Sequence, residues 1–361
     1  MSKVIYLGRS RLHRNRANLL QTLHTCAALH AIGVPLELNL PPWHRLDLDA
    51  RLRDILGFAT PLQVRPRQLL HRRWSPRWLA RLERRRLQQA AGVYLRDAEL
   101  SLALADAGIR HHFEVHQVRA LQEAGQLGDI VRFHRAGRIG WLVPISRAAA
   151  DALAAAGADP ERMHIAPSGV AIEAYAAIPS LTADDIARPR ALYIGRISRS
   201  RGLDVLLNVA ERGLTELLLV GEQDDPVPQR RGVEARGFVA PAQVPRLYGE
   251  AGLVLLPYQP SLPHSDAISP LKLFEAMAAG RVIIASDLPP IREVVDHGRT
   301  GLLVPADDPA AWARAVERIK ADPAEALAMA ANARAEAARF SWRQRALDIA
   351  VRLDLPRAVP A

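Results

Sequence analysis

The sequence contains a single cysteine, Cys26, in 361 residues. One thiol cannot build a framework of disulfide bonds, and this scarcity is typical of proteins that work in a reducing cytosol. No apolar run reaches the ~18 residues that a membrane-spanning helix needs, and the apolar run at the start of the chain is too short for a signal peptide. We therefore expect a cytoplasmic protein.

Several catalytic signatures are also missing. The chain has no HExxH sequence and no paired spacing of His and Cys, so we expect neither a metal site nor another cofactor. The absence of GxSxG argues against an esterase, and the absence of a P-loop sequence argues against a P-loop nucleotide hydrolase.

The composition and periodicity indicate an α/β protein. Hydrophobic residues make up 49% of the chain and charged residues 24%, as in soluble globular proteins, and the length suits two domains. Both halves alternate short apolar runs, such as KVIYLG and RALYIGR, with stretches of helical periodicity. Repeated strand–helix units predict parallel sheets covered by helices on both faces. We expect two Rossmann-like, doubly wound domains that face each other across a cleft, the usual place for a small-molecule site.

The division between the domains is predicted from a poorly periodic stretch, residues 171–189, which contains Pro179 and Pro189. We interpret this stretch as a linker. It separates an N-terminal domain, 1–170, from a C-terminal domain, 190–335.

Positive charge is concentrated in one segment. The net charge is +10, and residues 51–86 contain eleven arginines against Asp54 and Glu83. Trp74 and Trp78 lie four residues apart inside this segment, as in a basic amphipathic helix with interfacial aromatics. Two interpretations stay open: a surface that docks on anionic membrane lipid or on a phosphate-bearing acceptor, and an arginine-rich face exposed to water. No recognised nucleic-acid-binding module appears, so we do not expect nucleic acid as a partner.

The segment 266–280, DAISPLKLFEAMAAG, has the signals of a complete helix. Ser269 suits the N-cap, Pro270 suits the first helical position, and Gly280 suits the end. We therefore expect a cluster of free amides at the N-terminal end of this helix.

Two charged residues of this helix indicate a nucleotide. Lys272 and Glu275 are three residues apart, so they project from one side. Amides and a lysine suit a phosphate, and a carboxylate that accepts from a vicinal diol suits a ribose. The alternative is an exposed Lys/Glu pair on an ordinary helix, which would contribute little.

Other candidate residues follow predicted strands, because ligands of parallel sheets bind at the carboxyl ends of the strands. In the second half these residues are Gly195, Arg196, Arg201, Gly221 and Gly237. A glycine at a strand end, followed by two arginines and a helix, makes a plausible diphosphate clamp. In the first half the strand-end residues are Gly8, Arg9, Arg96, His116, Gln117 and Ser146.

Taken as a set, the motifs GRISRSRGLD, LLLVGE, SPLKLFEAMAAG and HGRTGLLVP resemble the donor-binding half of the retaining GT-B glycosyltransferases of family 4. The resemblance covers about 190–319. PSGV at 167–170 is similar to the hinge signature of the family, and residues 336–361 contain FSWRQRALDIA, which resembles its C-terminal helix that crosses back onto the first domain. The resemblance implies the GT-B fold and metal-independent transfer of a sugar, with retention of configuration, from a nucleotide sugar. The acceptor would be a glycan, a lipid-linked or another small-molecule hydroxyl. If the arginine-rich segment docks on anionic lipid, we expect the enzyme to be peripheral on the inner face of the membrane.

The resemblance also implies roles for individual residues. Arg196 and Arg201 would bind the donor diphosphate, Glu275 would hold the ribose hydroxyls, and His116 would approach the sugar from the other domain. The remaining donor-binding residues would be Gly195, Gly221, Gly237, Asp266, Ser269, Pro270, Leu271 and Lys272. The residues with a catalytic role would be Glu275, Lys272, Arg196 and His116, and those on the acceptor side would be Gly8, Arg9, Arg96 and His116.

One position departs from the family pattern. The family commonly has a second glutamate eight positions before the one that binds ribose, and here that position is Ala267, next to Asp266. A GT-B-like protein that binds a sugar nucleotide or glycan without turnover therefore stays open as an alternative.

Overall fold

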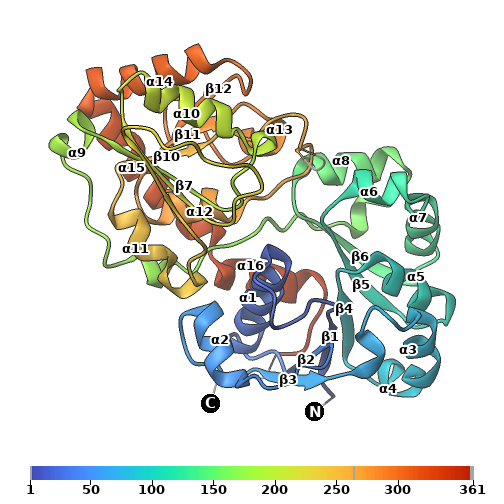
Figure 1. The fold of residues 1–361 in the computed structure, drawn as a ribbon. Coiled ribbons are helices and arrows are strands. Elements are labelled where there is room, and N and C mark those ends of the chain that lie inside the picture. The colour runs from blue at the N-terminus through green and yellow to red at the C-terminus, as the bar shows by residue number, and fades with distance from the viewer. Residues whose placement is uncertain (1, 263–264, 358–361) are drawn as a thin grey trace. The chain divides into compact units, whose positions relative to one another are not determined.

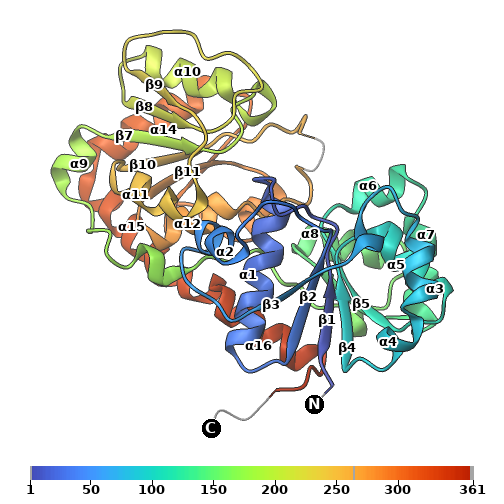
Figure 2. The ribbon, with the colours of Figure 1, turned by 60° about the horizontal axis from the view of Figure 1, so that its bottom comes forward.

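The computed structural model describes residues 2–262 and 265–357, and the chain forms two compact α/β units (Figures 1 and 2). The first unit contains the residues up to Ser168 together with those from Trp342 onward, and the second runs from Gly169 to Ser341. Each unit has a six-stranded parallel sheet. The predicted pair of doubly wound parallel sheets is therefore confirmed.

The first sheet has the strand order β3-β2-β1-β4-β5-β6. Its strands are β1 (Val4–Leu7), β2 (Leu36–Leu40), β3 (Gln63–Pro66), β4 (Gly92–Leu95), β5 (His111–Val115) and β6 (Ile139–Pro144). The helices of this unit are α1 (Ala17–Ala31), α2 (Leu48–Leu56), α3 (Pro76–Leu82), α4 (Arg84–Gln88), α5 (Ala98–Asp106), α6 (Val118–Glu123), α7 (Leu127–Arg135), α8 (Arg147–Ala155) and α16 (Trp342–Arg352). The central strand β1 is buried at all four positions, as expected for a parallel sheet with helices on both faces.

The second sheet has the order β12-β11-β10-β7-β8-β9. Its strands are β7 (Arg190–Ile194), β8 (Glu216–Val220), β9 (Val233–Arg236), β10 (Leu253–Leu256), β11 (Val282–Ser286) and β12 (Leu302–Val304). The helices are α9 (Ala183–Ala187), α10 (Leu203–Glu211), α11 (Val244–Gly249), α12 (Leu271–Ala278), α13 (Pro289–Arg292), α14 (Pro309–Ala321) and α15 (Pro323–Glu336). Strands β10 and β11 are buried at every position. The candidate residues of this unit therefore lie at the carboxyl ends of strands that belong to a packed core.

The stretch interpreted as a linker, 171–189, is instead an ordered part of the second unit. Tyr175 and Ile178 belong to one side of its core and Ile186 to the other. Helix α9 within this stretch begins with a capping box between Thr182 and Asp185. Pro179 and Pro189 therefore lie in ordered chain that packs against the second unit, and they do not mark a flexible linker.

Two features of the first unit come from unexpected parts of the chain. Strand β3 lies within the arginine-rich segment at the edge of the sheet, and Val64 is its one buried residue.

Helix α16 packs beside α1, where Ala346 and Ile349 join the core of the first sheet (Figure 1). The C-terminal helix thus completes a domain that begins more than 300 residues earlier.

We expect Gly221→Ala to destabilise the second unit strongly. Gly221 follows β8 with φ +145°, and an added Cβ would lie 2.0 Å from the carbonyl oxygen of Gly195. Backbone strain and this clash together should lower the free energy of unfolding by about 3 kcal/mol. Gly213→Ala is the matched control, because φ is also positive (+67°) but nothing lies within 4 Å, so about 1 kcal/mol is expected. Denaturant unfolding would measure both values, and equal losses would contradict the close approach.

Candidate functional site

Helix α12 carries the centre of the candidate site, but it begins later than its sequence indicates. Pro270 occupies the N-cap with an extended backbone (ψ 121°), and its carbonyl accepts from the Leu273 amide at 3.0 Å. The prediction that Ser269 caps the helix and Pro270 starts it is therefore wrong, because the proline keeps the extended conformation and Leu271 is the first helical residue. The predicted end is correct, since Gly280 follows the helix with φ +61°.

Lys272 points back towards the carboxyl end of β7. Its Nζ lies 4.0 Å from the centre of the Tyr193 ring and 5.3 Å from that of Tyr258. Gly195 makes room for it, because a Cβ there would lie 2.5 Å from Nζ. Burial, with the nearby charge of Arg201, lowers the pKa of Lys272 to about 7. Among the described residues no carboxylate lies within ion-pair distance of this ammonium group, so its charge is available to an anion.

Glu275 lies one turn further along the same helix. Its Oε2 accepts a hydrogen bond from the Tyr248 hydroxyl at 3.0 Å, and that hydroxyl also lies 3.2 Å from the Lys272 carbonyl oxygen. Burial raises the pKa of Glu275, while hydrogen bonds from Tyr248 and Tyr175 and the charge of Lys272 oppose the rise. A carboxylate held by two tyrosine hydroxyls keeps acceptor capacity for a ligand.

The two arginines after β7 take different positions. Arg201 lies close enough to Lys272 to lower its pKa, and its NH1 donates to Ser198 Oγ at 3.3 Å. Arg196 is half-exposed and is paired with Asp224, with Nε 3.0 Å from Oδ2. This hydrogen bond lowers the pKa of Asp224. Arg201 therefore faces the lysine, whereas Arg196 would have to leave Asp224 to reach a ligand beside it.

The remaining candidate residues of the second unit differ in how deeply they are buried. Gly195 directly follows β7 and Gly221 directly follows β8. The two turns are in close contact, since the Gly195 amide donates to the Val220 carbonyl at 2.8 Å. Gly237 follows β9 and is exposed. Ala267 is buried, and its neighbour Asp266 is exposed. A carboxylate at 266 is thus not directed into the protein at the place where the family pattern has glutamate.

The candidates of the first unit lie at the carboxyl ends of β1, β4 and β5. Gly8 is packed against the side chain of Leu40, where a Cβ would lie 2.8 Å from Cδ2. Arg9 is buried and is engaged within the protein, since its NH1 lies 2.8 Å from Glu99 Oε2 and its Nε donates to the Leu70 carbonyl.

The other two residues of this edge are also held in place. Arg96 donates to Gln21 Oε1 at 2.8 Å. His116 bonds through Nε2 to Glu114 Oε1 at 2.5 Å. Structural contacts therefore fix all four of the residues predicted on the acceptor side.

Sequence reasoning missed the tyrosines that shape this site. The chain has six tyrosines, and four of them, Tyr175, Tyr193, Tyr248 and Tyr258, lie around Lys272 and Glu275. Two carried a usable signal, because Tyr193 is the last residue but one of β7 and Tyr258 follows β10 at the carboxyl edge. Tyr175 and Tyr248 come from other elements, and no local pattern connects them to Glu275.

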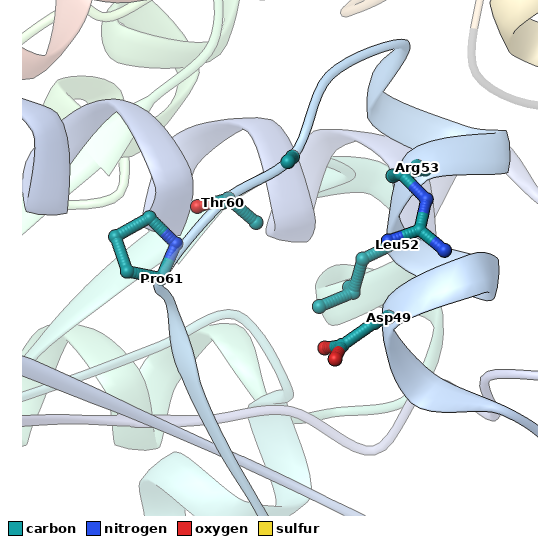
Figure 3. A pocket seen from close by; sticks show the side chains of 6 residues that line it. Asp49, Leu52, Arg53, Thr60 and Pro61 are labelled. Atoms are coloured by element: carbon teal, nitrogen blue, oxygen red, sulfur yellow. The ribbon is translucent and has the colours of Figure 1, made fainter.

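A short acidic motif at the start of α2 lies beside a surface hollow, and both belong to the first unit. Asp47–Leu48–Asp49 is a DxD sequence, so the inference from the sequence that the chain lacks such metal-binding motifs was wrong at this place. Asp47 caps α2 by accepting from the Ala50 amide at 3.0 Å, and Asp49 lines a hollow of about 230 Å³ with Arg53 and Pro61 (Figure 3). Within 2–262 and 265–357, no group of three or more His, Cys, Asp or Glu side chains could hold a metal ion. The hollow contains none of the predicted site residues.

Residues 188–322 match the family model described as Glycosyl transferases group 1. We call residues 188–322 the glycosyl transferases group 1 segment. The glycosyl transferases group 1 segment contains the second sheet together with Lys272, Glu275 and both arginines of the candidate site.

Curated relatives match part of the chain. D-inositol 3-phosphate glycosyltransferase of Xylanimonas cellulosilytica is 31% identical over 218 residues, which is 53% of this chain and 50% of that protein. The protein of the same name from Corynebacterium urealyticum is 28% identical over 189 residues, 46% of this chain and 42% of the relative. The chain spans about half the length of the curated relatives it matches.

Solved structures match over nearly the whole chain. HepE from Anabaena in complex with UDP-glucose has a TM-score of 0.73 at 18% identity and covers 98% of this chain and 100% of that chain. Sucrose-phosphate synthase from Thermosynechococcus elongatus also has a TM-score of 0.73 at 18% identity, with 98% of each chain covered. This likeness shows that the fold of the glycosyl transferases group 1 segment and its partner unit is GT-B.

We expect Lys272 to lose its proton near pH 7 in the ligand-free protein, because burial and Arg201 disfavour its charged form. The chain has three lysines, Lys3, Lys272 and Lys320, so NMR of lysine labelled with ¹³C at Cε would resolve the titration, and Lys272→Met would assign the signal. Arg201→Ala should raise the midpoint, since it removes a neighbouring positive charge. A midpoint above pH 9 in the unaltered protein would contradict the proposed environment.

Proposed function

We propose that the protein transfers a sugar from a nucleotide-sugar donor to a hydroxyl acceptor, with retention of configuration and without a divalent metal. The observation that carries this proposal is the pairing of Lys272 with Glu275 on one turn of α12, inside the glycosyl transferases group 1 segment. Lys272 is partly buried and has no ion pair with any described residue. HepE from Anabaena has been solved in complex with UDP and with UDP-glucose, which supports a donor of this class.

The charges at this edge suit the departure of a diphosphate. A nucleoside diphosphate is a good leaving group, and the developing negative charge needs fixed cations more than a proton donor. Lys272 and Arg201 supply two such charges, and Arg196 supplies a third when it exchanges Asp224 for the phosphate. This arrangement supports transfer without a metal, since side chains take the place that a cation would fill.

Glu275 is the residue that we assign to the ribose. Its carboxylate is held by Tyr248 and Tyr175, so its orientation does not depend on the ligand. Two vicinal hydroxyls can donate to its two oxygens, as carboxylates do in other nucleotide-binding α/β domains. The acceptor stays a broader proposal, a glycan, a lipid-linked or a small-molecule hydroxyl.

The alternative function is binding of a sugar nucleotide or glycan without transfer. The buried Ala267 favours it, because the carboxylate that usually faces the donor sugar is missing there. A protein of this kind would bind a nucleoside diphosphate and release no product.

We expect sugar transfer that persists in excess EDTA and that keeps the anomeric configuration of the donor. The assay would offer a panel of nucleotide sugars, and NMR of the first product would show the anomer. Glu275→Ala should reduce kcat/KM by about tenfold or more, since it removes a charge-assisted hydrogen bond to the donor. Glu317→Ala, an exposed carboxylate on α14, is the control and should behave as the unaltered protein. Loss of activity in EDTA that manganese restores, or binding without any product, would overturn the proposal.

The exposed surface of α3 supports a second part of the proposal, docking on an anionic membrane. Leu79 and Ala80 turn inward against α5, and Trp78 and Leu82 are 50% and 66% exposed on the opposite side. Trp74, just before the helix, is 39% exposed. Trp78 and Leu82 are one helical turn apart, so they lie on the same face of α3, and Trp74 adds a third exposed apolar side chain beside them. We call these three side chains the apolar ridge, and its exposure to water is unfavourable.

Arginines flank this ridge. Arg72, Arg73, Arg77 and Arg81 are all exposed, and none of these guanidinium groups has an ion pair among the residues that the structure describes. Each arginine near an anionic surface contributes about 1 kcal/mol, and the tryptophans suit the interface between headgroups and acyl chains. No helix in the described part of the chain is long and apolar enough to cross a membrane. The combination fits a protein that lies on the membrane surface.

We expect the protein to sediment with vesicles that contain anionic lipid at low salt and to be released at high salt. Replacement of four arginines by glutamine should abolish sedimentation and leave nucleotide binding intact; the four are Arg72, Arg73, Arg77 and Arg81. A control with the same change in net charge alters four exposed arginines elsewhere, Arg119, Arg132, Arg135 and Arg343. If both quadruple variants lose binding equally, net charge and not this surface is responsible.

A further inference from the structure

A buried carboxylate in the first unit is surrounded by donors that the proposed reaction does not use. Glu114 lies in β5 and is 2% exposed. Its Oε2 accepts from the Tyr94 hydroxyl and lies 3.0 Å from NH2 of Arg345. Its Oε1 bonds to Nε2 of His116 at 2.5 Å. Glu114 therefore connects Arg345 of α16 to His116, the residue predicted to contact the sugar.

Arg345 is fixed on all sides. Its NH1 donates to Thr25 Oγ1 at 3.0 Å and its Nε to the carbonyl of Pro167 at 2.8 Å, while NH2 faces Glu114. The guanidinium group is buried and stacks near the Trp342 ring at 5.7 Å. Because all three nitrogens are engaged, Arg345 can hold Glu114 in one position.

The charges decide which nitrogen of His116 carries the proton. Burial opposes the ionisation of Glu114, but Arg345 and the hydrogen bond from His116 outweigh it and hold the pKa of Glu114 well below its usual value. An ionised carboxylate accepts only, so Nε2 of His116 must donate. Burial, with the charge of Arg96, lowers the pKa of His116 to about 4. The imidazole is therefore neutral at pH 7, and its Nδ1 has a lone pair.

We propose that Glu114 and Arg345 are positioning residues that hold His116 with Nε2–H on Glu114 and with Nδ1 turned outward, where it accepts a hydrogen bond from a sugar hydroxyl. This inference rests on the proposed function for its substrate, and it assigns a role in that reaction to the C-terminal helix. His116 has no other hydrogen bond in the described part of the chain, so Nδ1 is free to accept.

The tautomer can be observed without any substrate. In protein with ¹⁵N-labelled histidine at pH 7, the imidazole of His116, assigned with His116→Ala, should show a protonated Nε2 and an unprotonated Nδ1. Glu114→Gln should populate the other tautomer, because a neutral amide no longer selects a donor. A wild-type His116 protonated on Nδ1 would overturn the proposal, whether or not the protein transfers sugar.

Kinetics separate positioning from general destabilisation. Glu114→Gln should lower kcat by about tenfold with the affinity for nucleoside diphosphate unchanged, and it should cause no further loss in a His116→Ala protein. Arg345→Met should behave in the same way, and Arg345→Lys, which keeps a charge beside Glu114, should recover most of the activity. Arg343→Gln, an exposed arginine of the same helix, is the control.

Equal losses from Glu114→Gln with and without His116 would mean that Glu114 serves only the fold. A circular dichroism melt of each variant, together with the affinity for nucleoside diphosphate, excludes misfolding as the cause of a loss. Absence of transfer in the unaltered protein would contradict the proposed function, and the tautomer measurement would still decide the positioning.

Discussion

The candidate site depends on a partly buried ammonium group, that of Lys272, which no carboxylate among the described residues neutralises. Lys272 is held by the faces of two tyrosine rings and by the space above Gly195, and these contacts replace only part of the hydration that burial removes. The incomplete compensation is visible in its pKa of about 7. An anionic group beside Lys272 would supply the missing interaction, so this environment favours negative charge at the carboxyl end of β7.

The scarce aromatic hydroxyls are concentrated where this protein buries charge. Tyr193 and Tyr258 contact Lys272, and Tyr248 and Tyr175 serve Glu275. The other two tyrosines, Tyr6 and Tyr94, stack edge to face at 5.2 Å beside Glu114. A tyrosine combines an apolar ring with a donor at its tip, so it can both exclude water from a carboxylate and satisfy one of its oxygens.

Much of the fold could be predicted because it depends on local periodicity. Apolar runs mark five of the six strands of the first sheet and all six of the second. The three-residue spacing placed Lys272 and Glu275 on one side of a helix. Strand β3 escaped because one buried residue, Val64, leaves no alternating pattern. The contacts of Tyr175 and Arg345 escaped for another reason: they join segments far apart in the chain, and no spacing within the sequence encodes such a pair.

The return of α16 to the first unit has a consequence for biosynthesis. A ribosome releases the first sheet, with Glu114 in β5, long before it translates Arg345 and the apolar face around Ile349. Domains generally fold as units in the order of their synthesis, but here the second unit emerges whole while the first still lacks its last helix. Until that helix arrives, Glu114 lacks its guanidinium partner and the groove beside α1 is open to water. The first unit to be made is therefore the last to be finished.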